Sequence, residues 1–135
     1  MVAEVTAMAG RVRIRRRGSF ERLPSETATP LAMVLTEVLQ NAVEHGYDRD
    51  AGAVDAGAGE PVGTITVEVT RRGSRLEVAV VDDGRGLPEG FDLDGSTNLG
   101  LSIVRTLVES ELGGRLALGP AAGGGTRAAI DLPVE

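Results

Sequence analysis

The sequence predicts an α+β fold, a two-layer sandwich in which a mixed, mostly antiparallel sheet carries its helices on one face. Strand-like and helix-like segments follow one another in the order β, α, ββ, α, ββ, and consecutive strands of this kind form hairpins. Two segments repeat apolar residues at helical spacing, which gives each helix one face to bury. A chain of 135 residues with 41% hydrophobic content can build one core, so residues 1–135 are predicted to form a single domain.

Residues 11–17, RVRIRRR, alternate apolar and basic side chains through Val12 and Ile14, which predicts a strand. The arginines would occupy its outer side, and we expect the strand to lie at an edge of the sheet. Charged side chains commonly protect such an edge from pairing with another chain. The alternative is that these arginines form a docking patch for an acidic partner.

Residues 31–46, LAMVLTEVLQNAVEHG, form the predicted helix around which the fold is organised. Thr29 is the expected N-cap, Pro30 would take the first helical position, and Gly46 would end the helix. The predicted inward stripe consists of apolar residues at helical spacing: Leu31, Val34, Leu35, Val38, Leu39, Ala42 and Val43.

Glu37, Asn41 and His45 follow one edge of this stripe at intervals of four residues, so they stack on the same helix face. A carboxylate, an amide and an imidazole beside a buried face favour a binding site. A solvated helix edge is the ordinary alternative, and this helix alone does not separate the two.

The middle of the chain predicts a loop followed by a hairpin. Residues 48–63 are rich in Gly, Ala and acidic residues, which predicts a flexible surface loop. Residues 64–71 and 76–82 are predicted strands joined by a turn around Gly73. The second of these strands is nearly all apolar, as expected for a central strand that is covered on both faces.

Residues 98–112 are predicted to form a second helix that ends at Gly113 and Gly114. Residues 115–118 and 126–132 are predicted to be the last two strands, joined by a turn. The inward residues of the second helix are expected to be Leu99, Ile103, Val104, Leu107, Val108 and Leu112.

The nearly apolar strand leads directly into DDGRGLP, residues 82–88. A carboxylate such as Asp82 is costly at the mouth of a buried strand unless it accepts from a strong donor, and a ligand amino group would serve. Gly84 and Gly86 would let the backbone pass close to a flat ligand. An ordinary Asp-Gly turn is the alternative.

The second predicted helix begins within STNLGL, residues 96–101. Small polar residues at a helix N-terminus favour an anion site, and phosphate is the obvious anion. Simple capping by Thr97 or Asn98 is the alternative. Gly100 in the first turn lowers helix stability by roughly 1 kcal/mol, so a close backbone approach to a ligand would explain it.

Composition excludes several classes of site. The chain has no cysteine and a single histidine, which rules out disulfides, thiolate metal sites and multi-histidine metal sites. All fourteen basic residues are arginine, so a Walker-A loop is excluded. A net charge of −6 and few aromatic residues disfavour nucleic-acid binding. No apolar run or signal peptide indicates a membrane, so we expect a cytoplasmic protein with no membrane contact from this segment.

Four motifs together resemble the nucleotide-binding domain of the GHKL family, or Bergerat fold, shared by sensor histidine kinases, gyrase B and MutL. Glu37 with Asn41 and Ala42 is similar to the N box, and DDGRGLP to the first glycine box. NLGLSIV is similar to the second glycine box, and GGGTRAAIDLP to the closing GT-plus-strand element. The resemblance covers residues 11–134 and is nearest to bacterial two-component sensor kinases.

The resemblance implies a role for each matching residue. Asn41 would ligate Mg²⁺ under the ATP phosphates, and Asp82 would accept from the adenine amino group. Glu37 sits where gyrase-type members keep a general base. Residues 91–98 would form an ATP lid, with Ser96 and Asn98 at positions where the family has glycine. The remaining ATP-binding residues would be His45, Gly84, Gly86, Leu87, Asn98, Leu99, Gly100, Leu101 and Thr126.

The resemblance also implies the reaction: binding of Mg-ATP and transfer of the γ-phosphoryl to a histidine on a separate dimerisation domain, and from there to a response regulator. His45 lies in the N-box helix, so the acceptor would be elsewhere and this chain would be a piece of a longer kinase. Alternatives are an anti-sigma-factor serine kinase, a water-splitting ATPase clamp, and a non-catalytic nucleotide-sensing interaction module. The departures in the second glycine box motivate the last.

Overall fold

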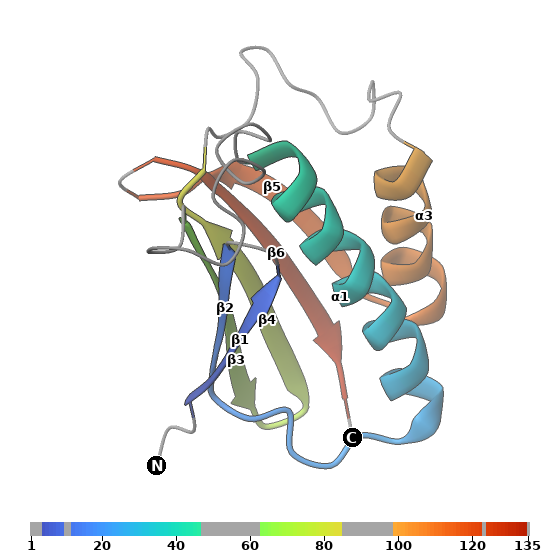
Figure 1. The fold of residues 1–135 in the computed structure, drawn as a ribbon. Coiled ribbons are helices and arrows are strands. Elements are labelled where there is room, and N and C mark those ends of the chain that lie inside the picture. The colour runs from blue at the N-terminus through green and yellow to red at the C-terminus, as the bar shows by residue number, and fades with distance from the viewer. Residues whose placement is uncertain (1–3, 10–11, 47–62, 85–98, 123, 135) are drawn as a thin grey trace.

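The computed structural model describes residues 4–9, 12–46, 63–84, 99–122 and 124–134, and within these ranges it leaves out the side chains of 4–9, 44–46 and 99–100. One sheet lies behind two helical segments that cover one of its faces (Figure 1). The predicted two-layer α+β sandwich is therefore confirmed. In chain order the elements are β1 (Glu4–Ala9), β2 (Val12–Arg17), α1 (Ser25–Gly46), β3 (Gly63–Arg72), β4 (Arg75–Asp82), α3 (Leu99–Thr106), η1 (Leu107–Glu111), β5 (Arg115–Pro120) and β6 (Thr126–Pro133).

Within the described residues the sheet has six strands in the order β1-β2-β3-β4-β6-β5. Neighbouring strands are antiparallel except β2 and β3, which are parallel. The prediction of an edge strand at 11–17 is wrong, because β1 pairs with β2 along its whole length, from Glu4 opposite Arg17 to Ala9 opposite Val12. β1 mixes the strand formers Val5 and Thr6 with Glu4, Ala7 and Ala9, which have low strand propensity, so its strand signal in the sequence is weak.

The predicted hairpin and its central strand are confirmed. Arg72 pairs with Arg75, which leaves Gly73 and Ser74 as a two-residue turn. Gly73 has φ +58°, a conformation that glycine adopts without steric cost. β4 is hydrogen-bonded to β3 on one side and β6 on the other, which explains its nearly apolar sequence.

Helix α1 begins at Ser25, six residues before the predicted start, so the proposed Thr29 cap is wrong. The carbonyl oxygen of Pro24 accepts from the N–H groups of Thr27 (2.9 Å) and Ala28 (2.8 Å) and thereby starts the helix. Pro30 lies inside the helix, where its missing N–H removes only the bond to the carbonyl of the solvent-exposed Glu26. Water can satisfy that carbonyl, so the helix continues.

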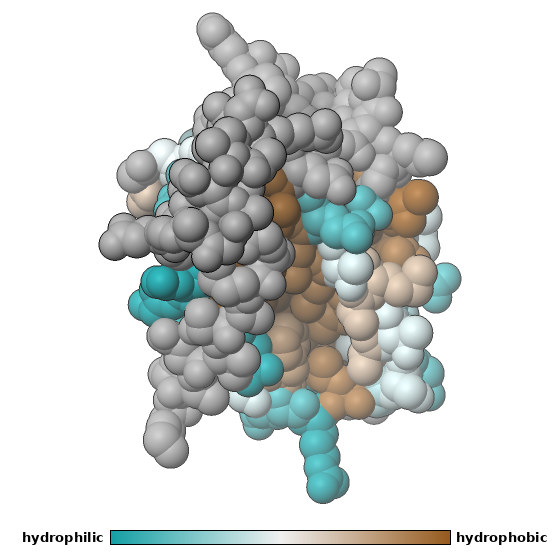
Figure 2. Space-filling model, viewed as in Figure 1, coloured by the Kyte–Doolittle hydropathy of each residue, from teal (hydrophilic) through white to brown (hydrophobic). Residues whose placement is uncertain are grey.

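The core lies between the helices and the covered face of the sheet. Leu31, Val34 and Val38 of α1 are buried, and the other predicted stripe residues pack against them. In the same view, an apolar strip runs beside α1 (Figure 2). The helical segment after residue 98 buries Val104 and Val108 as predicted, whereas Ile103 is 48% exposed, so its inward placement is wrong.

The second helical segment ends in a wider turn. α3 passes directly into η1, a π-helical turn, whose last residues are tied by the N–H of Leu112 to the carbonyl of Leu107 (3.0 Å). A Cβ at Gly114 would lie 2.2 Å from the carbonyl oxygen of Asp131, so only glycine lets this end meet β6. No helix in the described part of the chain is long and apolar enough to cross a membrane.

Candidate functional site

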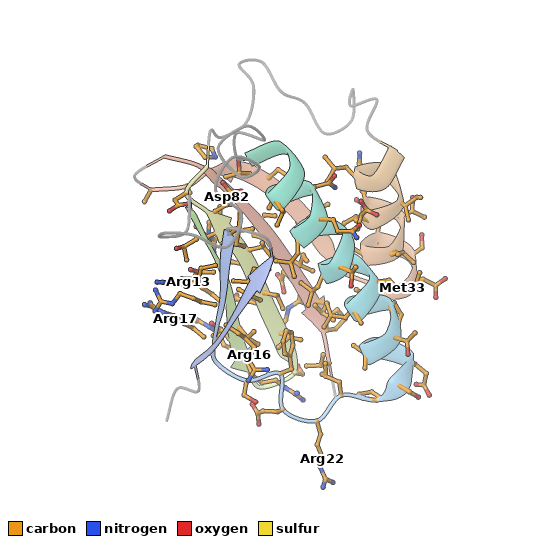
Figure 3. All side chains as sticks on the ribbon, viewed as in Figure 1. Arg13, Arg16, Arg17, Arg22, Met33 and Asp82 are labelled. Atoms are coloured by element: carbon orange, nitrogen blue, oxygen red, sulfur yellow. The ribbon has the colours of Figure 1, made fainter. Side chains whose placement is uncertain are left out.

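Three motif-bearing segments meet at one end of the domain. The C-terminal ends of α1 and β4 and the N-terminal end of α3 all lie at this end, opposite the β3–β4 turn (Figure 1). Asp82 is labelled there, at the end of β4 (Figure 3). The N-box helix, the end of the nearly apolar strand and the second glycine-box helix are thus brought together by the sheet topology.

Asp82 is the buried carboxylate of this end, with only 6% of its surface exposed. Leu76, Val78 and Val80 are buried at every second position of β4, and Asp82 is the next residue in this series. Asp82 therefore faces the helix-covered side of the sheet, as these three residues do. Oδ1 accepts from the backbone N–H of Gly84 (2.9 Å) and from that of Thr126 (3.2 Å). The first bond forms a local turn after the strand, and the second ties β4 to the start of β6.

These two bonds use one carboxylate oxygen. Within the described residues no hydrogen bond is made to Oδ2. A buried carboxylate with one oxygen that makes no hydrogen bond favours a ligand donor, as the sequence predicted for a carboxylate at the end of a buried strand. Gly84 and Thr126, both predicted site residues, are thus hydrogen-bonded to Asp82.

The environment of Asp82 disfavours its charge. Burial raises the pKa of the Asp82 carboxyl above its ordinary value, because desolvation penalises the charged form. The N–H donors of Gly84 and Thr126 lower the pKa in opposition, and the neighbouring Asp83 raises it further. A ligand that donates a hydrogen bond to this group would therefore relieve a cost that the free protein carries.

Gly125 is a site residue that the sequence reasoning missed. A Cβ on Gly125 would lie 2.0 Å from the carbonyl oxygen of Asp82, and its φ is +86°. Only glycine fits at this contact, because Gly125, which directly precedes Thr126, lies against the backbone at the end of β4. The run of three glycines at 123–125 was the available signal, but the sequence does not say which of them meets the carboxylate strand.

Asn41 lies on α1 near the same end. Its Nδ2 is buried and has no hydrogen-bond partner among the described residues, which is unusual for an amide. Glu37, one turn earlier, is half-buried. His45 is part of the helix, one turn later, and its side chain lies outside the described residues.

An amide can present either its oxygen or its nitrogen to the same position by a half-turn, so Asn41 can accept as well as donate. Mg²⁺ in phosphate sites is commonly held by one or two protein oxygens together with substrate phosphates. Within the described residues no group of three or more His, Asp or Glu could hold a metal alone. A single amide oxygen from Asn41 is compatible with a metal site that is completed by a phosphate ligand.

The other predicted site residues divide into two groups. Leu99, Gly100 and Leu101 form the first turn of α3 as predicted, and Leu101 is half-buried. Outside the described residues lie Gly86, Leu87, Asn98, the predicted lid at 91–98 and most of the predicted loop at 48–63.

Comparison with known proteins gives the family. Residues 26–135 match the family described as histidine kinase-, DNA gyrase B-, and HSP90-like ATPase. The chain belongs to this family, and the GHKL resemblance read from four short motifs is confirmed.

The chain is similar to named sensor kinases over nearly its full length. It is 42% identical over 131 residues to the sensor histidine kinase PdtaS of Mycobacterium tuberculosis, and this alignment covers 97% of this chain and 24% of PdtaS. It is 35% identical over 127 residues to blue-light-activated histidine kinase 2 of Erythrobacter litoralis, and that alignment covers 93% of this chain and 33% of the relative. The chain thus spans about a quarter to a third of these relatives.

Solved structures agree with this fold. The Erythrobacter litoralis blue-light activated histidine kinase superposes with a TM-score of 0.75 at 32% identity, over 93% of this chain and 36% of that one. The ATP binding domain of PrrB from Mycobacterium tuberculosis superposes with a TM-score of 0.59 at 26% identity, over 79% and 68%.

Proposed function

We propose that this chain is the catalytic, ATP-binding domain of a sensor histidine kinase. It would bind Mg-ATP and deliver the γ-phosphoryl to a histidine on a separate dimerisation domain. One observation carries the proposal: a buried carboxylate with an unused oxygen, Asp82, lies at the same end of the domain as the buried Nδ2 of Asn41, which has no hydrogen-bond partner among the described residues. Membership of the family and the similarity to sensor kinases support it.

Asp82 would recognise adenine. Its Oδ1 is held by two backbone N–H groups, which fixes the carboxylate plane and leaves Oδ2 to accept from the adenine amino group. Gly84, Gly86 and Leu87 would border the base, and Thr126 would support it beside the carboxylate. A guanine ring presents an oxygen at the corresponding position, so the same carboxylate would repel it.

Asn41 would act at the phosphate end. Its amide oxygen would hold Mg²⁺, which when bound supplies positive charge to the phosphate oxygens. The backbone of residues 98–101 would donate N–H groups to the phosphates at the start of α3, and His45 would line the site nearby. Residues 91–98 would form the lid over the nucleotide.

The transfer breaks the bond between the γ-phosphorus and its bridging oxygen, leaving ADP, and forms a bond from phosphorus to an imidazole nitrogen. Such a step depends mainly on positioning and charge stabilisation. The acceptor would belong to another part of a longer kinase, since the chain spans about a quarter of its PdtaS relatives. A response regulator would then take the phosphoryl group, and we place this pathway in the cytoplasm.

Nucleotide binding is tested by titration calorimetry of Mg-ATP with the wild type, Asp82→Asn and Asp83→Asn. The Asp82 change replaces the buried acceptor by an amide and should weaken binding roughly 10- to 100-fold. Asp83 is the matched control, an exposed carboxylate whose Oδ1 accepts from the N–H of Thr64 at 2.9 Å. Its variant should stay within about threefold of the wild type. Equal affinities for all three proteins would contradict the adenine assignment.

The reaction is tested with ATP labelled at the γ-phosphate and the histidine-bearing segment of the PdtaS relative supplied in trans. Phosphohistidine is labile in acid and stable in alkali, whereas phosphoserine behaves in the opposite way. An acid-labile product on the supplied segment supports the kinase. An acid-stable phosphoserine product would support the serine kinase instead, and tight ATP binding with no product of either kind would favour the nucleotide-sensing module.

Glu37 separates transfer from hydrolysis. It is half-buried on α1, one turn before Asn41, where it could act as a general base for water. If hydrolysis is a real activity of this site, Glu37→Gln should abolish phosphate release from ATP while transfer to a supplied histidine continues. Loss of both activities together would assign Glu37 to the transfer step itself.

A further inference from the structure

The face of the sheet that the helices leave uncovered carries half of the chain's fourteen arginines. Strand alternation places them there: residues next to them in sequence, such as Ile14, Leu76 and Ala128, face the core instead. We call this surface the arginine face. Its arginines are Arg13, Arg15, Arg17, Arg72, Arg75, Arg115 and Arg127.

Edge protection does not explain the arginines of β2. β2 lies inside the sheet, hydrogen-bonded to β1 and to β3, so it has no open edge to protect. Arg13 and Arg17 are exposed and project from β2 away from the helices (Figure 3). The structure thus removes the commoner of the two explanations that the sequence left open for this run.

The charge of this face is opposite to that of the whole chain. On strands β2 to β6 the seven arginines are accompanied by three carboxylates, Glu68, Glu77 and Asp131, and Asp83 adds a fourth just beyond β4. The chain as a whole has a net charge of −6. Positive charge is therefore gathered on one face of an acidic protein, as in surfaces that steer an acidic partner.

Part of this positive charge is not neutralised locally. Arg72 pairs with Glu77 at 3.6 Å and Arg75 with Asp131 at 2.6 Å. Arg13, Arg115 and Arg127 make no ion pair within the described residues, and all three are exposed. Two of the carboxylates are thus already occupied, while three exposed guanidinium groups remain available to a partner.

Between the arginines of β2 and β6 the face is low at the end nearest Asp82. There Thr66 of β3 and Val81 of β4 lie in register between Arg15 and Arg127, whereas the longer side chains of Glu68, Arg72, Arg75 and Glu77 stand farther along the same two strands. With about 4.8 Å between neighbouring strands, the arginines of β2 and β6 lie roughly 14 Å apart. An α-helix with its side chains measures about 10–12 Å across, so the end of a helix fits between them at this low end.

We propose that the arginine face docks an acidic α-helix of another protein or of another domain. Carboxylates on both flanks of such a helix would meet Arg13 on one side and Arg127 on the other, and its small residues would lie on Thr66 and Val81. A nucleic acid is a poorer occupant, because its extended phosphate charge would be repelled by the acidic remainder of the chain. The inference does not depend on ATP binding.

The test is a binding titration with an alanine-rich helical peptide of about 20 residues that carries glutamates on two flanks. The variant Arg13→Gln/Arg127→Gln removes one arginine from each row. Arg22→Gln/Arg105→Gln is the matched control, because it removes the same charge away from the arginine face, including the exposed Arg105–Glu109 pair at 3.0 Å. Thermal unfolding of both variants checks that each is folded.

Wild-type protein should bind this peptide at about 50 mM salt and lose roughly tenfold in affinity at about 200 mM. The face variant should bind about 5- to 10-fold more weakly than the wild type, and the control within about twofold. No binding by the wild type, or equal weakening in the two variants, would overturn the proposal. Tighter binding to duplex DNA or to phosphatidylglycerol vesicles than to the peptide would also overturn it.

Discussion

The two ends of strand β4 differ in how their polar groups are satisfied. At the turn end, the strand leaves a two-residue turn, Leu76 is fully buried, and the carbonyl of Ser74 accepts from the N–H of Val134 at 2.7 Å. At the other end, the strand finishes on the buried carboxylate of Asp82, which keeps an unused oxygen and a raised pKa. The C-terminal part of α1, which carries the unpartnered Nδ2 of Asn41, reaches that same end.

This contrast indicates a division between stability and binding along a single strand. The turn end is packed and hydrogen-bonded, so changes there should alter the free energy of unfolding. The Asp82 end holds polar groups at a cost to stability, as expected where a ligand completes the structure. Three experiments test this division between the two ends of β4.

The largest effect is expected at Gly125, which contacts Asp82 and therefore bears on both stability and ligand binding. Gly125→Ala would place a Cβ 2.0 Å from the carbonyl of Asp82, which forces the backbone apart and should cost about 4 kcal/mol of unfolding free energy. Gly124→Ala is the matched control, because Gly124 also has a positive φ but no atom lies within 4 Å of a Cβ added there. This variant should lose about 1–2 kcal/mol of unfolding free energy. Urea denaturation measures both. Equal losses would show that the close contact with Asp82 is not what requires glycine.

A core truncation at the turn end should change stability alone. Leu76→Ala leaves a cavity at a position with no exposed surface and should lower the free energy of unfolding by about 3 kcal/mol. Because Leu76 lies far along the strand from Asp82, the folded variant should bind Mg-ATP with the wild-type affinity. Urea denaturation measures the free energy of unfolding, and calorimetry on the same sample measures the affinity for Mg-ATP. A large loss of affinity in folded protein would break the division between the two ends.

The smallest effect is a pH dependence at the Asp82 end. The pKa of Asp82 is raised in the folded state, so the folded protein holds the proton of this carboxyl more tightly than the unfolded chain does. The contribution of Asp82 to the stability of the fold therefore falls as the pH rises from 3.8, the ordinary pKa, through the pKa of the folded state. Asp82→Asn removes that loss while it keeps an oxygen for the N–H groups of Gly84 and Thr126. The variant should gain stability relative to the wild type over this pH window. A difference between the two proteins that does not vary with pH would contradict this origin.

The sequence was most informative where one local signal sufficed. Gly73 in a short turn predicted the hairpin, and the stripe from Leu31 to Val43 predicted the face that α1 buries. Asp82 after an apolar strand predicted a buried carboxylate. Four short motifs in order predicted the family. In each case neighbouring residues in sequence carry the physical reason, so no distant contact was needed.

The sequence was least informative where a contact with a distant segment decides the outcome. β1 becomes a strand because β2 offers it a partner, although its alanines have little strand propensity of their own. Ile103 has the spacing of an inward residue but lies at the margin of the helix face, so packing leaves it exposed. The start of helix α1 at Ser25 is a different case, because the contact that decides it is local: the carbonyl of Pro24 accepts from the N–H groups of Thr27 and Ala28.

Local sequence patterns were enough to predict most of the elements, the family and the chemistry of the principal side chains, because periodicity and turn residues act over a few positions. The pairing of distant strands was needed to show that Thr126 and Gly125 meet Asp82 and that the arginines of β2 belong to an interior strand. Those facts depend on pairing between strands far apart in the chain, which one-dimensional spacing does not encode.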